Sequence, residues 1–391
     1  MRPDTVFTSE ERQSIEAEFP RLGSRAYLNY ASVGPLPQRA RVVIDDINDS
    51  LQRLDRNFDA ETDLAIIRSR AAAASLIGGN PQDVGLMPNT SSGINWALGL
   101  FDLHPNDEIL ITDPEFPAVR YAASYREKRG IGLVRIPLES GQGLHPEALE
   151  EALTAHPRVR VVALSWICFH NGFRHNLKDL ATICHAHDAF FIVDGIQGVG
   201  TRALDVTAAG VDVFCAAIHK WLLTPVGLGF TWCSPEVADR FSSPVGGWQS
   251  VDWHAQYGDL FGPLKSFPRG PRAAEMGTAN YAGVRAMAET TEWIESIGPD
   301  RIHDYTQGLL DWFTDQIDPD RFELLSDRSK EHRSSIVCLR PKSNDTEALK
   351  RHLDNAGVVV SMREGAIRIS PHFPTASSIF EHLVQSLNEF S

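Results

Sequence analysis

The sequence lacks several features that would assign a protein to a membrane, an export route or a nucleic-acid complex. Its 391 residues contain no run of about 18 apolar residues, so no membrane-spanning helix is expected. The N-terminal segment lacks the apolar centre that a signal peptide has. The chain contains 37 basic and 51 acidic residues, so its net charge is negative. We therefore expect a cytoplasmic protein with neither nucleic acid nor a membrane as partner.

Cysteine is also scarce. The five cysteines are widely spaced and form no CxxC pair, which indicates buried thiols in a reducing compartment rather than a disulfide framework or a zinc cluster. The histidines show no spacing typical of metal ligation, so no metal site is expected.

Length and composition indicate a globular protein with more than one core. Hydrophobic residues make up 42% and charged residues 23% of the chain. A single core stops growing at about 250 to 300 residues, so this chain should divide. We expect an N-terminal arm at residues 1–25, a large domain at 26–285 and a small domain at 286–391.

The centre of the chain alternates between apolar strands and amphipathic helices. Strands are predicted at residues 83–87, 158–166, 189–193, 211–218 and 227–233, with a helix at 176–188. This alternation predicts an α/β fold whose mainly parallel sheet is covered by helices on both faces. The last hundred residues predict a smaller α+β domain, with helices within 290–318 and 378–390 and short strands at 335–339, 358–361 and 366–370.

Two chemically distinctive side chains follow neighbouring strands of this sheet. Asp194 ends one apolar strand, and Lys220 follows the next one. Ligands of open parallel sheets bind at the carboxyl ends of strands. A carboxylate and a lysine there suit pyridoxal phosphate, which needs an acid beside its ring nitrogen and an amine for covalent attachment. A buried ion pair without function is an equally good interpretation of these two residues alone.

A second segment of interest opens a predicted helix. Thr90 and Ser91 follow the strand at 83–87, and hydroxyl groups at a helix N-terminus can hold an anion. Threonine and serine at this position also serve as plain helix caps, so this segment alone does not establish an anion site.

Taken together, these pieces resemble a known family in order and spacing. They are Thr90-Ser91, Asp194-x-x-Gln197, His219-Lys220 and Gly277-Thr278-Ala279-Asn280. The sequence resembles the class V aminotransferase family of fold-type I pyridoxal-phosphate enzymes, especially its isopenicillin N epimerase-like and cysteine desulfurase-like branch. The resemblance covers nearly the whole chain, from about Tyr27 to the C-terminus.

The resemblance implies a role for each matching residue. Lys220 would bind the cofactor covalently and move protons at the substrate Cα, while Asp194 would pair with the ring nitrogen. The remaining cofactor contacts implied are Gln197 at the ring hydroxyl, Phe116 over the ring face, Thr90, Ser91 and His219 at the phosphate, and Thr278 donated by the second subunit of a homodimer.

The resemblance also implies a substrate site. It places the substrate α-carboxylate on Arg368, with Asn29 and Tyr30 near the entrance. From its alternating strand alone, Arg368 would be interpreted as a surface arginine. Arg363, beside a Glu-Gly turn, is expected to be solvated.

The sequence departs from the family pattern at several positions, and one of these departures bears on which reaction the protein performs. Residues 361–367 contain no cysteine, which disfavours the persulfide chemistry of cysteine desulfurases. Alanines at 217, 273 and 274 replace residues that in relatives bind phosphate or line the site. We expect a pyridoxal-phosphate enzyme that performs carbon–sulfur β-elimination on a small-molecule substrate, an amino acid or an amino-acid conjugate such as a cysteine S-conjugate.

Alternatives remain open from the sequence. Epimerisation and transamination, including decarboxylative transamination, use the same residues, and the groups that discriminate lie in segments such as residues 246–259. A degenerate cofactor-binding partner protein, or a protein that binds another phosphate ligand, are candidates from other classes.

Overall fold

The computed structural model describes residues 6–22, 25–54, 58–139, 141–251, 253 and 261–390. The expected N-terminal arm is therefore described only at 6–22 and 25, and the segment 246–259 only at 246–251 and 253. Among the described residues, no helix is both long and apolar enough to cross a membrane.

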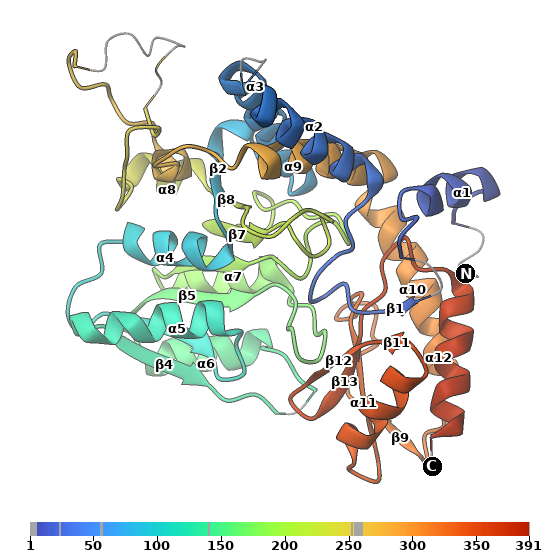
Figure 1. Cartoon of the computed structure of the whole chain (residues 1–391). Helices are drawn as coiled ribbons and strands as arrows, with labels where there is room; N and C mark the ends of the chain where they lie inside the picture. Colours follow the sequence, from blue (N-terminus) through green and yellow to red (C-terminus); the bar gives the residue numbers. More distant parts are fainter. Residues whose placement is uncertain are drawn as a thin grey trace.

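A seven-stranded sheet forms the centre of the larger part of the molecule (Figure 1). Its strands, in spatial order, are β2 (Val84–Met87), β8 (Gly229–Cys233), β7 (Val213–Ala217), β6 (Phe190–Asp194), β5 (Val159–Ser165), β3 (Glu108–Thr112) and β4 (Gly132–Ile136). The five strands from β7 to β4 are parallel, whereas β8 is antiparallel to both of its neighbours. The predicted α/β architecture with a mainly parallel sheet is confirmed.

Helices cover both faces of this sheet, which explains why its strands are apolar throughout. The helices of this part are α2 (Gln38–Arg53), α3 (Phe58–Leu76), α4 (Thr90–Leu100), α5 (Pro117–Arg126), α6 (Pro146–Ala155), α7 (Leu177–Ala186) and α8 (Pro235–Arg240). Val161 and Ala163 of β5 belong to the apolar cluster that includes α4 and α5, whereas Val162 and Leu164 belong to the one that includes α6 and α7. Alternate residues of a strand point to opposite faces, so both faces must be apolar.

The C-terminal part has its own antiparallel sheet. Its strands, in spatial order, are β12 (Ser361–Arg363), β13 (Ala366–Ile369), β10 (Val337–Pro341) and β9 (Phe322–Leu324), and α10 (Pro299–Asp315), α11 (Thr346–Asn355) and α12 (Ser377–Glu389) lie beside them. The predicted strand at 358–361 is instead divided, because β11 (Val358–Val359) leaves this sheet to pair with β1 (Ala26–Tyr27).

The chain near its N-terminus connects the two parts. After α1 (Ser9–Ala17), residues 26–30 run beside the C-terminal part, where the N–H of Tyr30 donates to the carbonyl of Ser370 at 3.1 Å. The chain then crosses to the larger part, where the N–H of Gly34 donates to the carbonyl of His219 at 2.8 Å. The division near residue 285 stays a prediction, since that position lies inside α9 (Tyr281–Ile297), which packs against α2 and α3.

Candidate active site

The carboxyl ends of four parallel strands bring three polar side chains and one aromatic ring to one edge of the large sheet. Asp194 ends β6 and Ser165 ends β5, in register with each other. Phe116 follows β3, and Lys220 follows β7. Because parallel strands all end at the same edge, residues far apart in the sequence meet there.

Lys220 is the cation at the centre of this edge. It is 6% exposed, and its Nζ lies 5.3 Å from the centroid of the Phe116 ring. Burial lowers the pKa of Lys220 to about 8; the charge of Asp194 opposes this effect, and Arg368 adds to it. A neutral amine, the form that attacks a carbonyl, is therefore accessible near physiological pH.

Asp194 is a buried carboxylate with one vacant hydrogen-bonding position. Its Oδ1 accepts from the N–H of Ile196 at 3.0 Å, whereas Oδ2 is buried and has no hydrogen-bond partner among the residues that the structure describes. Burial raises the pKa of Asp194 to about 7, although the Ile196 hydrogen bond and Lys220 both act to lower it. Among the described residues no hydrogen bond or ion pair joins Asp194 to Lys220, so Oδ2 can accept from the ring N–H of a pyridoxal-phosphate molecule. An orphaned acceptor of this kind fits that cofactor.

Gln197 has its amide fixed by two neighbours. The indole N–H of Trp221 donates to Oε1 at 3.0 Å, and Nε2 donates to the carbonyl of Ala31 at 3.1 Å. This arrangement sets which way the amide points and leaves the second hydrogen of Nε2 for a ligand oxygen. The family role of Gln197 at the ring hydroxyl is compatible with this geometry.

The predicted phosphate residues lie around the N-terminus of α4. The side chain of Asn89 caps this helix by accepting from the N–H of Ser92 at 2.9 Å. The hydroxyl of Thr90 accepts from the N–H of Ala217 at 2.9 Å and so joins the helix to the end of β7, beside His219. Ser91 is exposed. Burial and the charge of Lys220 lower the pKa of His219 to about 4, so the imidazole is neutral.

Thr278 is not brought to this cluster. It is exposed and lines a separate cavity of about 870 Å³, together with Ile67, Phe267 and Met87; neither Lys220 nor Asp194 lines that cavity. Within one chain, Thr278 therefore lines a cavity whose described lining residues include neither Lys220 nor Asp194.

Arg368 is buried in the interior, unlike the surface arginine that its strand pattern alone suggests. It is 2% exposed, and its guanidinium donates to three neutral oxygens: Ser32 Oγ at 2.7 Å, the Phe169 carbonyl at 2.9 Å and Ser361 Oγ at 3.1 Å. Burial lowers the pKa of Arg368 to about 10, and the positive charge of Arg363 adds to the effect. Among the described residues no carboxylate pairs with this guanidinium, which suits capture of a substrate carboxylate.

The other predicted substrate residues differ in position. Asn29 is half-buried, and its Oδ1 accepts from the hydroxyl of Ser32 at 2.8 Å, which places it next to Arg368. Tyr30 is fully buried, with its ring stacked on Trp221 at 6.5 Å, and its place near the entrance stays a prediction. Arg363 is half-buried rather than solvated, and its Nη2 donates to Ser32 Oγ at 3.4 Å.

Sequence reasoning missed two residues of this site. Ser32 joins Asn29 to Arg368, and only its place in a proline-flanked loop could have drawn attention to it. Glu115 is 6% exposed and accepts from the N–H groups of Ser165 at 2.9 Å and Phe116 at 2.8 Å. Burial raises the pKa of Glu115. Its position after β3, directly before Phe116, was the available signal.

Comparison with known proteins agrees with this geometry. A family model described as aminotransferase class-V matches residues 36–372. The chain is 26% identical to an isopenicillin N epimerase from Streptomyces clavuligerus, over 92% of this chain and 94% of the relative. It is 22% identical to a probable cysteine desulfurase from Methanothermobacter thermautotrophicus, over 97% and 98%.

Solved structures show the same fold. The cystine C–S lyase C-DES, in complex with its product cysteine persulfide, superposes with a TM-score of 0.86 at 21% identity, covering 95% of this chain and all of that one. A mutant of C-DES with glycine covalently linked to its pyridoxal-phosphate cofactor has the same TM-score and identity, covering 96% of this chain and 99% of that one.

Proposed function

The chain belongs to the aminotransferase class V family of pyridoxal-phosphate-dependent enzymes, and from that premise we propose that it cleaves a carbon–sulfur bond of an amino acid by β-elimination. The observation that carries the assignment of the site is the buried, unpartnered Oδ2 of Asp194 at the same sheet edge as the buried amine of Lys220. When bound, pyridoxal phosphate supplies an electron sink conjugated to the substrate Cα.

The protein's own groups then divide the work. Asp194 keeps the ring nitrogen protonated, because a carboxylate beside that nitrogen favours its protonated form. Arg368 holds the substrate carboxylate, and Phe116 limits how the ring can tilt. Lys220 removes the Cα proton and, in its protonated form, returns a proton to the departing sulfur.

The absence of a usable thiolate supports elimination over persulfide transfer. All five cysteines are buried, and burial raises the pKa of each thiol. Cys168, which lies in the segment after β5, is additionally disfavoured as a thiolate by the charge of Glu115. A neutral buried thiol is a poor nucleophile towards a sulfur atom of the substrate.

The proposed reaction balances without a further reactant other than water. An S-substituted cysteine loses its Cα proton, and its Cβ–S bond breaks with the electron pair leaving on sulfur. The released aminoacrylate takes up water, and the products are a thiol, pyruvate and ammonium. Epimerisation and transamination start from the same loss of the Cα proton and are the competing outcomes.

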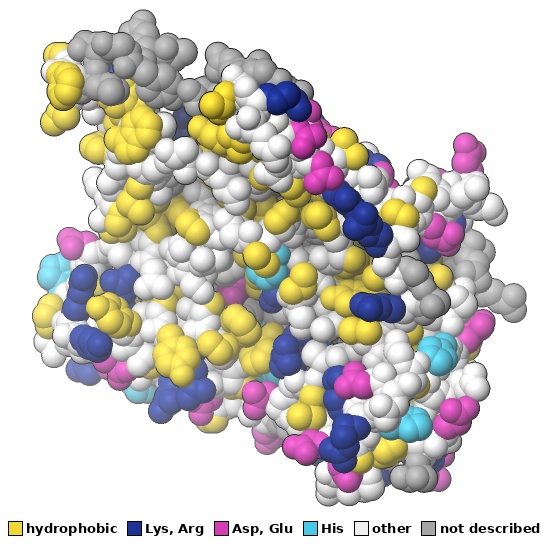
Figure 2. Space-filling view, in the orientation of Figure 1, with side chains coloured by type: hydrophobic (Ala, Val, Ile, Leu, Met, Phe, Trp, Pro, Cys, Tyr) yellow, Lys and Arg dark blue, Asp and Glu magenta, His cyan; other side chains and the backbone are white. Residues whose placement is uncertain are grey.

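We also propose a homodimer. Large apolar side chains of the cavity that contains Thr278 are exposed: Ile67 is 60% and Phe267 59% exposed. Leu264, three residues before Phe267, is 102% exposed. Hydrophobic side chains gather at the upper left of the view in Figure 2. A second copy covering this surface would remove them from water and bring Thr278 to a neighbouring site.

Purified protein supplied with cystine and with S-methylcysteine tests the reaction. We expect pyruvate, measured by coupling to lactate dehydrogenase, in an amount equal to the methanethiol released from S-methylcysteine or to the cysteine persulfide released from cystine. Lys220→Ala should form neither, whereas Lys178→Ala, which removes an exposed lysine, should retain full activity. Absence of both products, with inversion at Cα or transfer of the amino group to a keto acid, would replace β-elimination by epimerisation or transamination. Cofactor binding without any turnover would favour the degenerate partner protein.

A further inference from the structure

A second group of cationic side chains lies outside the site described above, where the two parts of the molecule meet. Arg174 follows β5 and Arg202 follows β6, so both belong to the larger part. Arg328 and Arg333 lie between β9 and β10 of the C-terminal part. The positive charges of all four guanidinium groups lower the pKa of His303 in α10. The side chain of His303 is buried, with 7% exposed.

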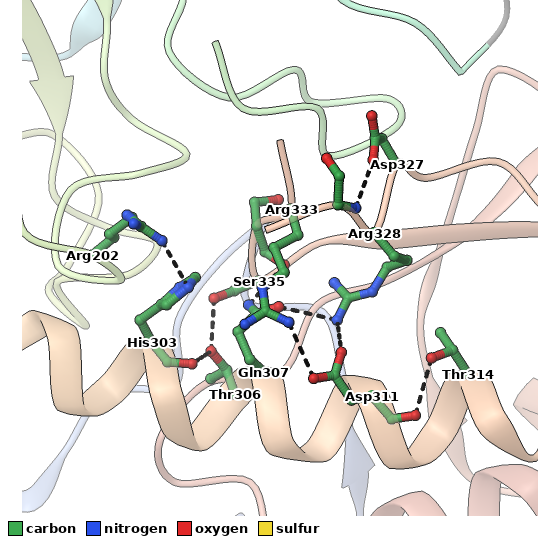
Figure 3. Close-up of polar contacts among 12 residues, drawn as sticks. Arg202, His303, Thr306, Gln307, Asp311, Thr314, Asp327, Arg328, Arg333 and Ser335 are labelled. Carbon is green, nitrogen blue, oxygen red and sulfur yellow. Dashed lines mark hydrogen bonds and ion pairs between the residues drawn. The ribbon is translucent and has the colours of Figure 1, made fainter. Parts of the chain in front are cut away.

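Among the described residues, Arg328 and Arg333 share one carboxylate partner, Asp311 (Figure 3). Arg328 donates to Oδ1 of Asp311 at 2.6 Å, and Arg333 donates to Oδ2 of the same carboxylate at 3.1 Å. The side chain of Asp311 is 51% exposed. Among the described residues it is the only carboxylate hydrogen-bonded to any of the four.

The remaining hydrogen-bond acceptors of the cluster are neutral. Arg202 donates to Nε2 of His303 at 2.8 Å, which requires that ring nitrogen to be unprotonated. Arg174 donates to the backbone carbonyls of Lys330 at 3.1 Å and Arg333 at 3.3 Å. Burial, and then the charges of the four arginines, lower the pKa of His303 to about 3, so the imidazole adds no positive charge.

Several N–H groups of the cluster have no acceptor in the part of the chain that the structure describes. They are Nε and Nη1 of Arg328 and Nε of Arg333, and all three are buried. A buried charged donor that lacks an acceptor costs free energy, because it has lost water and gained nothing in return. Burial lowers the pKa of Arg174 to about 10 and also lowers that of Arg328. The negative charge of Glu331 acts to raise the pKa of Arg174, and that of Asp327 acts to raise the pKa of Arg328. Among the described residues, neither carboxylate hydrogen-bonds to these arginines.

We propose that this cluster binds a small, multiply charged phosphoryl anion, such as pyrophosphate or a phosphate monoester. The half-buried Arg174, Arg202 and Arg333 would grip it from both parts of the molecule. A planar guanidinium offers two parallel N–H groups that match two phosphate oxygens, and such charge-assisted bonds are the strongest that arginine makes. The anion would also neutralise the repulsion between arginines of the larger part and those of the C-terminal part.

Titration calorimetry on the protein with pyridoxal phosphate bound tests the proposal, since the cofactor then occupies its own phosphate site. Pyrophosphate and inorganic phosphate are compared with citrate at constant ionic strength. We expect saturable binding of pyrophosphate and a rise in Tm with its concentration. No saturable phosphoryl binding, or tighter binding of citrate than of pyrophosphate, would overturn the assignment.

Variants locate the binding. Arg202→Met and Arg333→Met should each weaken the binding of pyrophosphate by about tenfold, because each substitution removes one charge-assisted contact. Arg202→Lys keeps the charge but loses the planar fork, so it should show an intermediate loss and serves if a methionine variant fails to fold. Arg351→Met, which removes a 68% exposed arginine of α11, should bind as the wild type does. Equal binding by the wild type, Arg202→Lys and Arg333→Met would place the anion elsewhere and contradict the proposal.

Discussion

The hydroxyl of Ser32 accepts a hydrogen bond at 2.7 Å from Nη2 of Arg368, although the two residues are 336 positions apart in the sequence. The same hydroxyl donates to Oδ1 of Asn29 at 2.8 Å, so the loop at residues 29–37 sets the direction of the guanidinium. Because this guanidinium is already fixed in one orientation, little conformational entropy is lost when it binds a carboxylate.

Ser32→Ala should therefore weaken substrate binding more than it slows chemistry. Arg368 retains its bonds to Ser361 and to the Phe169 carbonyl, so we expect KM for the amino-acid substrate to rise about tenfold, in line with the loss of one hydrogen bond to a charged group. Ser32→Thr, which keeps the hydroxyl, is the control and should lie closer to the wild type. An unchanged KM in Ser32→Ala would show that the hydroxyl does not position Arg368.

The depressed pKa of Lys220 gives a defined pH dependence. The amine is protonated below its pKa of about 8 and neutral above it, and only the neutral form attacks the aldehyde of pyridoxal phosphate. The rate at which cofactor-free protein captures pyridoxal phosphate should rise with pH and level off above about pH 8. Stopped-flow absorbance measures this rate. A midpoint near the ordinary lysine value of 10.5 would mean that the amine is solvated rather than buried.

Gly34 lets the N-terminal loop approach the backbone of Lys220. A Cβ at this position would collide with the carbonyl oxygen of Lys220 and lie 2.6 Å from Cδ2 of Leu223. Gly34→Ala should lower the free energy of unfolding by about 1–3 kcal/mol and weaken cofactor retention, because the loop or Lys220 must shift. Gly277→Ala, where a Cβ meets nothing within 4 Å, is the matched control for stability. Equal Tm values for the two variants would contradict the close packing described here.

The exposed apolar surface around Thr278 predicts a dimer that charge can dissociate. Ile67→Asp combined with Phe267→Asp should shift the mass measured by light scattering from two chains to one and reduce turnover, since no partner then supplies Thr278. Tyr121→Asp, at a 73% exposed residue of α5, should leave the dimer intact. A wild-type monomer with full activity would exclude the shared site.

Part of this organisation could be read directly from the sequence. Asp194 and Lys220 follow continuous apolar strands, and parallel strands end at one edge, so their proximity could be predicted from local patterns alone. The alternating strand around Arg368 was misleading because the isoleucines and Arg368 of β13 are all buried, with both faces of that strand covered. A period of two residues cannot distinguish a polar residue that faces solvent from one that faces a buried site.

Other features depend on contacts that no local pattern encodes. Ser32 meets Arg368, and Arg174 meets the carbonyls near Arg333, only because the two parts of the molecule pack together. The family resemblance places Tyr30 near the entrance, and the structure buries its side chain against Trp221. The role of Lys220 stays a prediction until the attachment site is identified.

The most direct measurement is the position of the covalent cofactor. Borohydride reduction of the protein loaded with pyridoxal phosphate, followed by proteolysis and mass spectrometry, should place the pyridoxyl phosphate group on the peptide that contains Lys220. The visible absorbance band should disappear on reduction and be missing in Lys220→Ala. A modified peptide that contains a different lysine, or no modified peptide at all, would contradict the assignment of Lys220.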